Sequence, residues 1–177
     1  FKNTSSVNIY PSIGPTIMTN SRNAATFSGT SYADTMSNTG ATVSVYGGAG
    51  NDSIYNSGYY SKIYAGDGND TVYGDSGKHL FRYGTGDGND VYYGFNENDT
   101  LQITSGTVSS ASVKGSDVVF TVNKSTVTLK DAAGKKVTMI DASGDASAYI
   151  YSDTMIFDAN KTSVTLASSF KGTLNSY

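Results

Sequence analysis

Two sequence periods predict an all-β fold, in which short parallel strands wind into stacked coils and a small antiparallel β unit follows them. The first is a series of large apolar residues spaced by nine: Ile9, Met18, Phe27, Met36, Val45, Ile54, Ile63, Val72 and Phe81. A helix face would recur every three or four residues and a single strand face every two. A spacing of nine therefore indicates a repeating unit, made of one tight turn and one short strand.

The second period is twice as long and belongs to the aspartates. Asp34, Asp52 and Asp70 end the turns SGTSYAD, GGAGND and AGDGND. Two nine-residue units would complete one coil with strands on opposite walls, so that these aspartates, one coil apart, stack along one edge. A fourth turn, GTGDGND, ends at Asp90, two positions later than the period requires, and this insertion is expected to mark the last turn.

The turn sequences carry a resemblance to a known family. GGAGNDSIY, from Gly47 to Tyr55, fits the pattern G-G-x-G-x-D-x-U-x, where U is a large apolar residue, and AGDGNDTVY departs from it only at its first residue. These motifs resemble the RTX, or haemolysin-type, calcium-binding nonapeptide repeat, and the segment from Phe81 to Ile103 is similar to a closing repeat of such arrays. The resemblance covers residues 29–103 and implies a parallel β-roll of 18-residue coils that binds calcium.

The chemistry of the turns fits this ion. Calcium takes about six to eight oxygen ligands at about 2.3–2.6 Å, which two stacked turns can supply. Glycines let several carbonyl oxygens approach one point, and the aspartates add charge. We expect two or three ions, with the gap between Asp52 and Asp70 the strongest site. The predicted metal-site residues are Asp34, Gly47, Gly48, Gly50, Asp52, Gly66, Gly68, Asp70, Gly86, Gly88 and Asp90.

The opposite edge of the coils lacks this pattern. Ser61 and His79 stand where a ligand aspartate would be needed, so we expect that edge to be free of metal, with Asp75 as a residue that could form a weak site. His79 is the single histidine, and the chain has no cysteine. A histidine cluster, a thiolate site and a Ser-His-Asp arrangement are therefore excluded within this sequence, and no enzymatic role is predicted.

Three segments are expected along the chain: an N-terminal entry cap at 1–27, an RTX-like β-roll at 28–103 and an antiparallel β C-terminal cap at 104–177. A cap would cover the unpaired strand edges of the last coil. Its strands are predicted at 117–123, 126–130, 135–141, 153–157 and 163–166, with DAAGKK, residues 131–136, as a hairpin turn.

Composition limits the remaining classes of function. The net charge of −3 and 12 scattered basic residues argue against nucleic acid. No segment reaches the roughly 18 apolar residues of a membrane span. The resemblance implies an extracellular or cell-surface protein, adhesin- or toxin-like, and FKNTSSVNIY does not read as a signal peptide, so an export signal is expected elsewhere in the parent.

Tyr46, Tyr55, Tyr64 and Tyr73 each follow an inward residue and are expected to point outward, Tyr46 and Tyr64 on one wall, Tyr55 and Tyr73 on the other. The simpler explanation is stacking that stabilises the sheets. The functional explanation is a face that binds a polysaccharide or a host or cell-surface protein. A non-catalytic calcium module is thus the main hypothesis. The alternatives are a binding module and the tail of a secreted enzyme whose catalytic domain lies outside this sequence.

Overall fold

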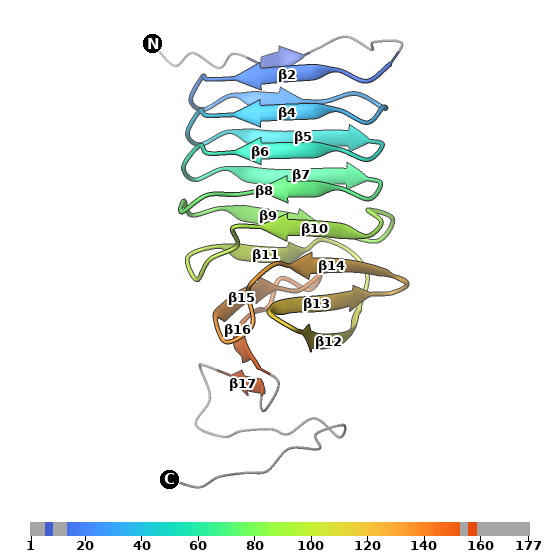
Figure 1. The fold of residues 1–177 in the computed structure, drawn as a ribbon, viewed down its shortest axis with the longest axis vertical. Coiled ribbons are helices and arrows are strands. Elements are labelled where there is room, and N and C mark those ends of the chain that lie inside the picture. The colour runs from blue at the N-terminus through green and yellow to red at the C-terminus, as the bar shows by residue number, and fades with distance from the viewer. Residues whose placement is uncertain (1–5, 9–13, 153–155, 159–177) are drawn as a thin grey trace, which may run out of the picture.

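The computed structural model describes residues 6–8, 14–152 and 156–158, and in this part of the chain all regular structure is β-strand. The strands wind into a tall stack of flat coils with two walls, and the chain moves down the stack from its N-terminus (Figure 1). The all-β prediction is confirmed.

Each wall is one sheet. The first, sheet A, has the order β1 (Ser6–Asn8), β3 (Thr26–Ser28), β5 (Ser44–Ala49), β7 (Lys62–Asp67), β9 (Leu80–Tyr83), β11 (Thr100–Ile103), β15 (Lys136–Ile140), β16 (Ala146–Tyr151) and β17 (Ile156–Asp158). The second, sheet B, has the order β12 (Val108–Lys114), β13 (Asp117–Val122), β14 (Ser125–Leu129), β10 (Asp90–Tyr93), β8 (Thr71–Tyr73), β6 (Ser53–Asn56), β4 (Thr35–Asn38) and β2 (Ile17–Asn20).

Strand pairing follows the 18-residue period. Val45 pairs with Ile63 in sheet A, and Ile54 pairs with Val72 in sheet B, both in parallel register. The spacing then lengthens: Ile63 still pairs with Phe81, but Val72 pairs with Tyr92, two positions beyond the period. The inserted residues therefore lie between Phe81 and Tyr92, in the turn that leads to Asp90.

The apolar series forms the core between the two sheets. Every member in the described residues is buried, with exposed fractions from 0% to 4%: Met18, Phe27, Met36, Val45, Ile54, Ile63, Val72 and Phe81. Ile9 lies outside the described residues. Strand positions next to the series point outward, since β-strands alternate faces, and this confirms the predicted inward column.

A ladder of asparagines lies at the edge opposite the aspartates. The Nδ2 atom of Asn20 donates to Oδ1 of Asn38 at 2.6 Å, and Nδ2 of Asn38 donates to Oδ1 of Asn56 at 2.6 Å. All three side chains are buried, with exposed fractions from 1% to 5%. This ladder was not predicted, although its members recur once per coil in the sequence, as the aspartates do.

An antiparallel unit ends the described chain, as predicted. β12, β13 and β14 pair antiparallel in sheet B, and β15, β16 and β17 do so in sheet A. The unit is continuous with the roll, because β14 pairs in parallel with β10, and β15 pairs in parallel with β11. The coils and the antiparallel unit thus share both sheets.

The prediction of a hairpin at DAAGKK is wrong. Residues 130–135 join β14 in sheet B to β15 in sheet A, so this turn is a corner between the two walls. The tight hairpin turns are Gly115–Ser116 and Asn123–Lys124, with positive φ at Gly115 and Asn123. The predicted strand at 163–166 lies outside the described residues, and β12 and β16 were not predicted.

Candidate metal centre at the aspartate edge

The four aspartates form one buried column. Asp34, Asp52, Asp70 and Asp90 have exposed fractions from 0% to 2%. The backbone N–H of Asp34 donates to Oδ1 of Asp52 at 2.7 Å, that of Asp52 donates to Oδ1 of Asp70 at 2.7 Å, and that of Asp70 donates to Oδ1 of Asp90 at 3.0 Å. Oδ1 of Asp52, of Asp70 and of Asp90 therefore each accepts a hydrogen bond from the backbone of the preceding coil.

The second oxygen distinguishes the members of the column. Oδ2 of Asp52 and Oδ2 of Asp70 are buried and have no hydrogen-bond partner in the described structure. A buried carboxylate oxygen without a partner is unfavourable by several kcal/mol unless a cation or a donor compensates it. These two oxygens fit an oxygen-binding cation such as calcium.

The pKa values of the two middle aspartates are raised. Burial raises the pKa of Asp52 to about 7, with added repulsion from Asp70 and Asp34. Burial also raises the pKa of Asp70 to about 6, with added repulsion from Asp87 and Asp67. The charged form of each group is disfavoured without a cation, so a bound divalent ion would stabilise it.

Glycines let the turns close around these carboxylates. A Cβ atom on Gly47 would lie 2.5 Å from Oδ2 of Asp52, which a real side chain could not occupy. Positive φ angles from 94° to 142° occur at Gly48, Gly50, Gly66, Gly68, Gly86 and Gly88. This backbone conformation is readily adopted by glycine alone among the residue types, and it lets successive turns approach closely.

Asp34 has different surroundings. Its Oδ1 accepts hydrogen bonds from N and Oγ1 of Thr16, both at 2.8 Å. Its Oδ2 accepts hydrogen bonds from N and Oγ1 of Thr30, at 2.7 and 2.8 Å. Burial acts to raise the pKa of Asp34, but these bonds outweigh it and lower the pKa below its ordinary value.

The Asp90 turn is also held by protein groups. The hydroxyl of Tyr92 donates to Oδ2 of Asp90 at 3.2 Å, and the hydroxyl of Tyr83 donates to the carbonyl oxygen of Gly88. Burial raises the pKa of Asp90 to about 8. Neither tyrosine was predicted to belong to the site; both stand at inward positions of β9 and β10 and are fully buried.

The opposite edge carries no matching oxygen column. Oγ of Ser61 donates to the carbonyl of Gly58 at 2.8 Å, and the backbone N–H of His79 donates to Oδ1 of Asp99 at 2.7 Å. Asp99 lies one coil after His79 and was not predicted, although its turn, GFNEND, ends as the aspartate turns do. Burial lowers the pKa of His79, so its ring is neutral at pH 7. Across the described residues, no three acidic, histidine or cysteine side chains converge on one point.

Comparison with protein families identifies the coils. A family model for the RTX calcium-binding nonapeptide repeat matches residues 28–58, 46–78 and 85–102. These segments are RTX calcium-binding repeats. They contain all four aspartates of the column, which confirms the resemblance and supports calcium as the ion. No curated protein matches the chain.

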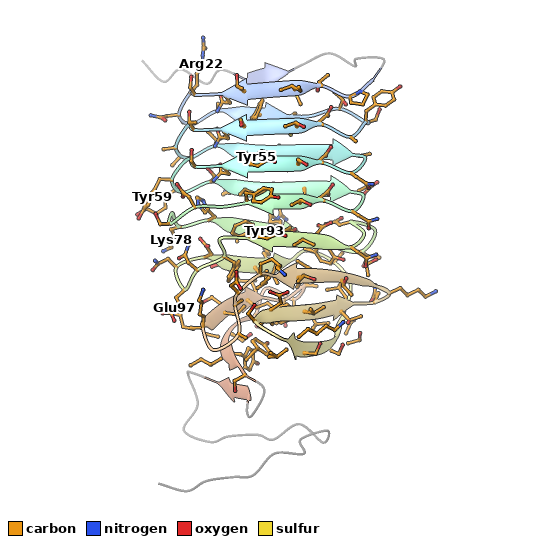
Figure 2. The ribbon with its side chains drawn as sticks, viewed as in Figure 1. Arg22, Tyr55, Tyr59, Lys78, Tyr93 and Glu97 are labelled. Carbon is orange, nitrogen blue, oxygen red and sulfur yellow. The ribbon has the colours of Figure 1, made fainter. Side chains whose placement is uncertain are left out.

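The RTX coils also carry the predicted tyrosine ladders. Tyr46 stacks on Tyr64 with ring centroids 4.5 Å apart, and the Arg82 guanidinium lies 4.3 Å from the Tyr64 centroid. On the other wall, Tyr55 stacks on Tyr73 at 4.7 Å. The series continues there, because Tyr73 stacks on Tyr93 at 4.8 Å, and Figure 2 shows Tyr55 and Tyr93 on the same face. The predicted placement on opposite walls is confirmed.

Proposed function

We propose that this chain is a non-catalytic structural module whose RTX roll is completed by calcium at the turns of Asp52 and Asp70. The observation that supports it is the pair of buried, unpartnered Oδ2 atoms on these two aspartates. Each is enclosed by a glycine turn whose backbone can bring carbonyl oxygens close. Calcium is a divalent cation that is coordinated by about six to eight such oxygens.

Calcium binding is coupled to folding in this proposal. Asp52 and Asp70 repel each other when both are charged, and the glycine-rich turns lose much conformational entropy on ordering. An ion present at 100 times its dissociation constant stabilises the folded state by about 2.7 kcal/mol per site. Two such sites would stabilise the fold by an amount comparable to much of a small domain's total stability.

The test is circular dichroism and thermal unfolding, in calcium-free buffer and in millimolar calcium. We expect the melting temperature to rise by about 10 °C or more with calcium, as several kcal/mol would produce in a chain of this size. Asp52→Asn and Asp70→Asn keep the side-chain shape and should each remove much of that increase. Asp67→Asn is the matched control, and equal loss in all three variants, or no calcium effect in the wild type, would refute the proposal.

We also propose that the parent protein works outside the cell or on its surface, in an adhesin, a toxin or the tail of a secreted enzyme. Extracellular calcium modules have dissociation constants of about 0.1–1 mM, and a chain without cysteine gains stability from bound calcium in place of disulfides. The described residues include no helix suited to crossing a membrane. Calorimetric titration with calcium tests the extracellular location, because it measures the dissociation constant. A submicromolar dissociation constant would fit the calcium level of the cytosol instead.

A second candidate function is polysaccharide binding beside the Tyr55 ladder. One ring face of Tyr55 stacks on Tyr73, and its other neighbour along the sheet is the small residue Ser37. A groove of about 240 Å³ opens there, and Asp75 also lines it. An exposed ring face beside hydroxyl and carboxylate groups suits a sugar ring. Tyr46 and Tyr64 form the corresponding, smaller ladder on the other wall.

Glycan-array binding tests this second function. We expect Tyr55→Ala to abolish any glycan binding. Tyr59→Ala should retain it, since Tyr59 is similarly exposed, at 50% against 45%, but lies outside the groove. A chain that binds no glycan with calcium present would contradict polysaccharide binding by the tyrosine ladder.

A further inference from the structure

The ends of the aspartate column differ from its middle in the hydrogen bonds that Oδ2 of the aspartate accepts. In the middle turns, Oδ2 of Asp52 and of Asp70 has no donor. At the upper end, Oδ2 of Asp34 accepts two hydrogen bonds from Thr30. At the lower end, Oδ2 of Asp90 accepts one from the Tyr92 hydroxyl.

Thr30 takes the place that glycine has in the calcium turns. It lies one full coil before Gly48, and the two residues are adjacent in the stack, since the backbone N–H of Ala49 donates to the Thr30 carbonyl. Gly48 has a φ of 114°, whereas Thr30 is not among the residues with positive φ. The Thr30 backbone therefore aims its N–H at the Asp34 carboxylate, and its hydroxyl adds a second donor to the same oxygen.

The residue corresponding to Gly50 is changed as well. Tyr32 lies one full coil before Gly50, whose φ is 108°, and Tyr32 too lacks a positive φ. The turn before Asp34 thus lacks both of the left-handed residues that shape the turn before Asp52. The backbone of this turn therefore differs from that of the turn before Asp52. In addition, both carboxylate oxygens of Asp34 already accept hydrogen bonds from protein donors.

At the Asp90 end of the column, tyrosine hydroxyls donate the hydrogen bonds to the turn. Tyr92 is 1% exposed and donates to Asp90, while Tyr83, 0% exposed, donates to the Gly88 carbonyl in the same turn. The N–H of Gly84 donates to Oδ2 of Asp87 at 2.6 Å and closes this turn further. Both a carboxylate oxygen and a carbonyl oxygen that a cation would need are already engaged by protein donors.

We propose that the hydroxyls of Thr30 and Tyr92 terminate the calcium column, so that this RTX roll binds two calcium ions, at the turns of Asp52 and Asp70. The carboxylates of Asp34 and Asp90 are then satisfied by protein hydrogen bonds, so neither turn holds an ion of its own, and each contributes only backbone carbonyl oxygens to the ion at the neighbouring turn. The inference rests on the proposed calcium function and adds the number of ions and the residues that set it.

Equilibrium dialysis at saturating calcium tests it by counting ions per chain. The wild type should bind two. Thr30→Gly combined with Tyr32→Gly removes the hydroxyl and places glycine at both positions that are left-handed in the turn before Asp52, and should bind three, while Thr30→Ser combined with Tyr32→Gly keeps the hydroxyl and should bind two. Tyr92→Phe keeps the ring and frees Oδ2 of Asp90, and should also gain one ion, whereas Tyr93→Phe, on the outward-facing neighbour, should not.

The outcomes separate this inference from the function on which it rests. A wild type that binds three or more ions, or a folded Thr30→Gly and Tyr32→Gly double variant and a folded Tyr92→Phe variant that both still bind two, would overturn the inference and leave the calcium function in place. A wild type that binds none would overturn both. Circular dichroism of each variant in calcium confirms that the chain counted is folded, and the wild-type count decides the matter even if a variant does not fold.

Discussion

At the scale of single residues, aspartates that share one sequence period have opposite electrostatic surroundings. Asp34 is stabilised as a carboxylate by four hydrogen bonds, and its pKa falls below the ordinary value. Asp52 is equally buried but keeps one oxygen unpaired, and its pKa rises to about 7. The period places the carboxylates in a column, whereas the residues of each turn decide whether a cation is needed there.

This difference predicts the pH dependence of the calcium-free roll. The pKa of Asp52 is about 7 and that of Asp70 about 6 in the folded chain, against 3.8 for an ordinary aspartate. The folded state therefore binds more protons than the unfolded state between about pH 4 and pH 7, so its stability falls as the pH rises through this window. We expect the melting temperature without calcium to be higher at pH 5.5 than at pH 8.

Calcium should remove the contribution of Asp52 and Asp70 to that dependence. The bound ion stabilises their deprotonated carboxylates, so protonation must displace it, and these two groups then favour the folded state more as the pH rises. Asp90 and Asp99, whose pKa values burial raises to about 8 and about 7, contribute equally with and without calcium. Thermal melts at four pH values, in metal-free buffer and in millimolar calcium, measure both slopes. Equal slopes in the two series would contradict the assignment of Asp52 and Asp70.

Core substitutions test the inward column. Ile54→Ala and Ile63→Ala remove side chains that are at most 1% exposed, and each should lower the free energy of unfolding in calcium by about 2–5 kcal/mol. Ile17→Ala is the matched control, because Ile17 is 86% exposed and its truncation should change stability by about 0.5 kcal/mol or less. Urea unfolding measures all three, and equal losses would show that the column does not form the core.

At the scale of elements, the strands of the roll could be predicted from sequence and those of the antiparallel unit only in part. The nine-residue period fixes both the strand positions and their partners, since each strand pairs with the strand two units later, as Val45 does with Ile63. The composition of DAAGKK predicts a turn, but it does not predict to which sheet the next strand belongs. That choice depends on the pairing of β15 with β11, which is distant in sequence.

The candidate site, too, could be predicted from the sequence only in part. The spacing of the motifs predicts the aspartate column and the glycine turns. The hydrogen bonds from Thr30 and Tyr92 do not, because each depends on the backbone angle of one residue or on a side chain that reaches across a turn. Motif spacing shows where a carboxylate lies, but it does not show which donors the fold places beside it.

The asparagine ladder gives a prediction at the same scale. Asn38 both donates to Asn56 and accepts from Asn20, so Asn38→Ala removes a hydrogen bond to each neighbouring coil, although Nδ2 of Asn20 keeps the Arg22 carbonyl. It also removes the bonds of Asn38 to the N–H and the carbonyl of the buried Gly40. We expect a loss of about 1–3 kcal/mol or more in stability, since one substitution leaves more than one group unsatisfied. Asn23→Ala, at an exposed position with a single backbone bond, is the control and should cost about 1 kcal/mol or less. The comparison uses urea unfolding in calcium, and equal effects would mean that the ladder adds no stability.

At the scale of the whole molecule, the antiparallel unit covers the last coil. β14 occupies the edge of β10, β15 occupies the edge of β11, and both edges would otherwise present unpaired backbone groups. The core also continues into this unit: Phe120, Val127 and Leu129 are fully buried in the same cluster as Leu101. The roll and its cover therefore share one core and both sheets, and we expect them to unfold together.

Truncation tests this cooperativity. A chain that ends at residue 103 loses β12 to β17, exposes the edges of β10 and β11 and uncovers Leu101, so we expect it to aggregate or to remain unfolded even in millimolar calcium. A chain that ends at residue 158 keeps every described strand and should show the full calcium-dependent increase in melting temperature. Circular dichroism and light scattering of the two chains, with and without calcium, give the comparison. A chain of residues 1–103 that folds on calcium addition as the longer chain does would show that the RTX coils need no cover, and that residues 104–177 serve another purpose.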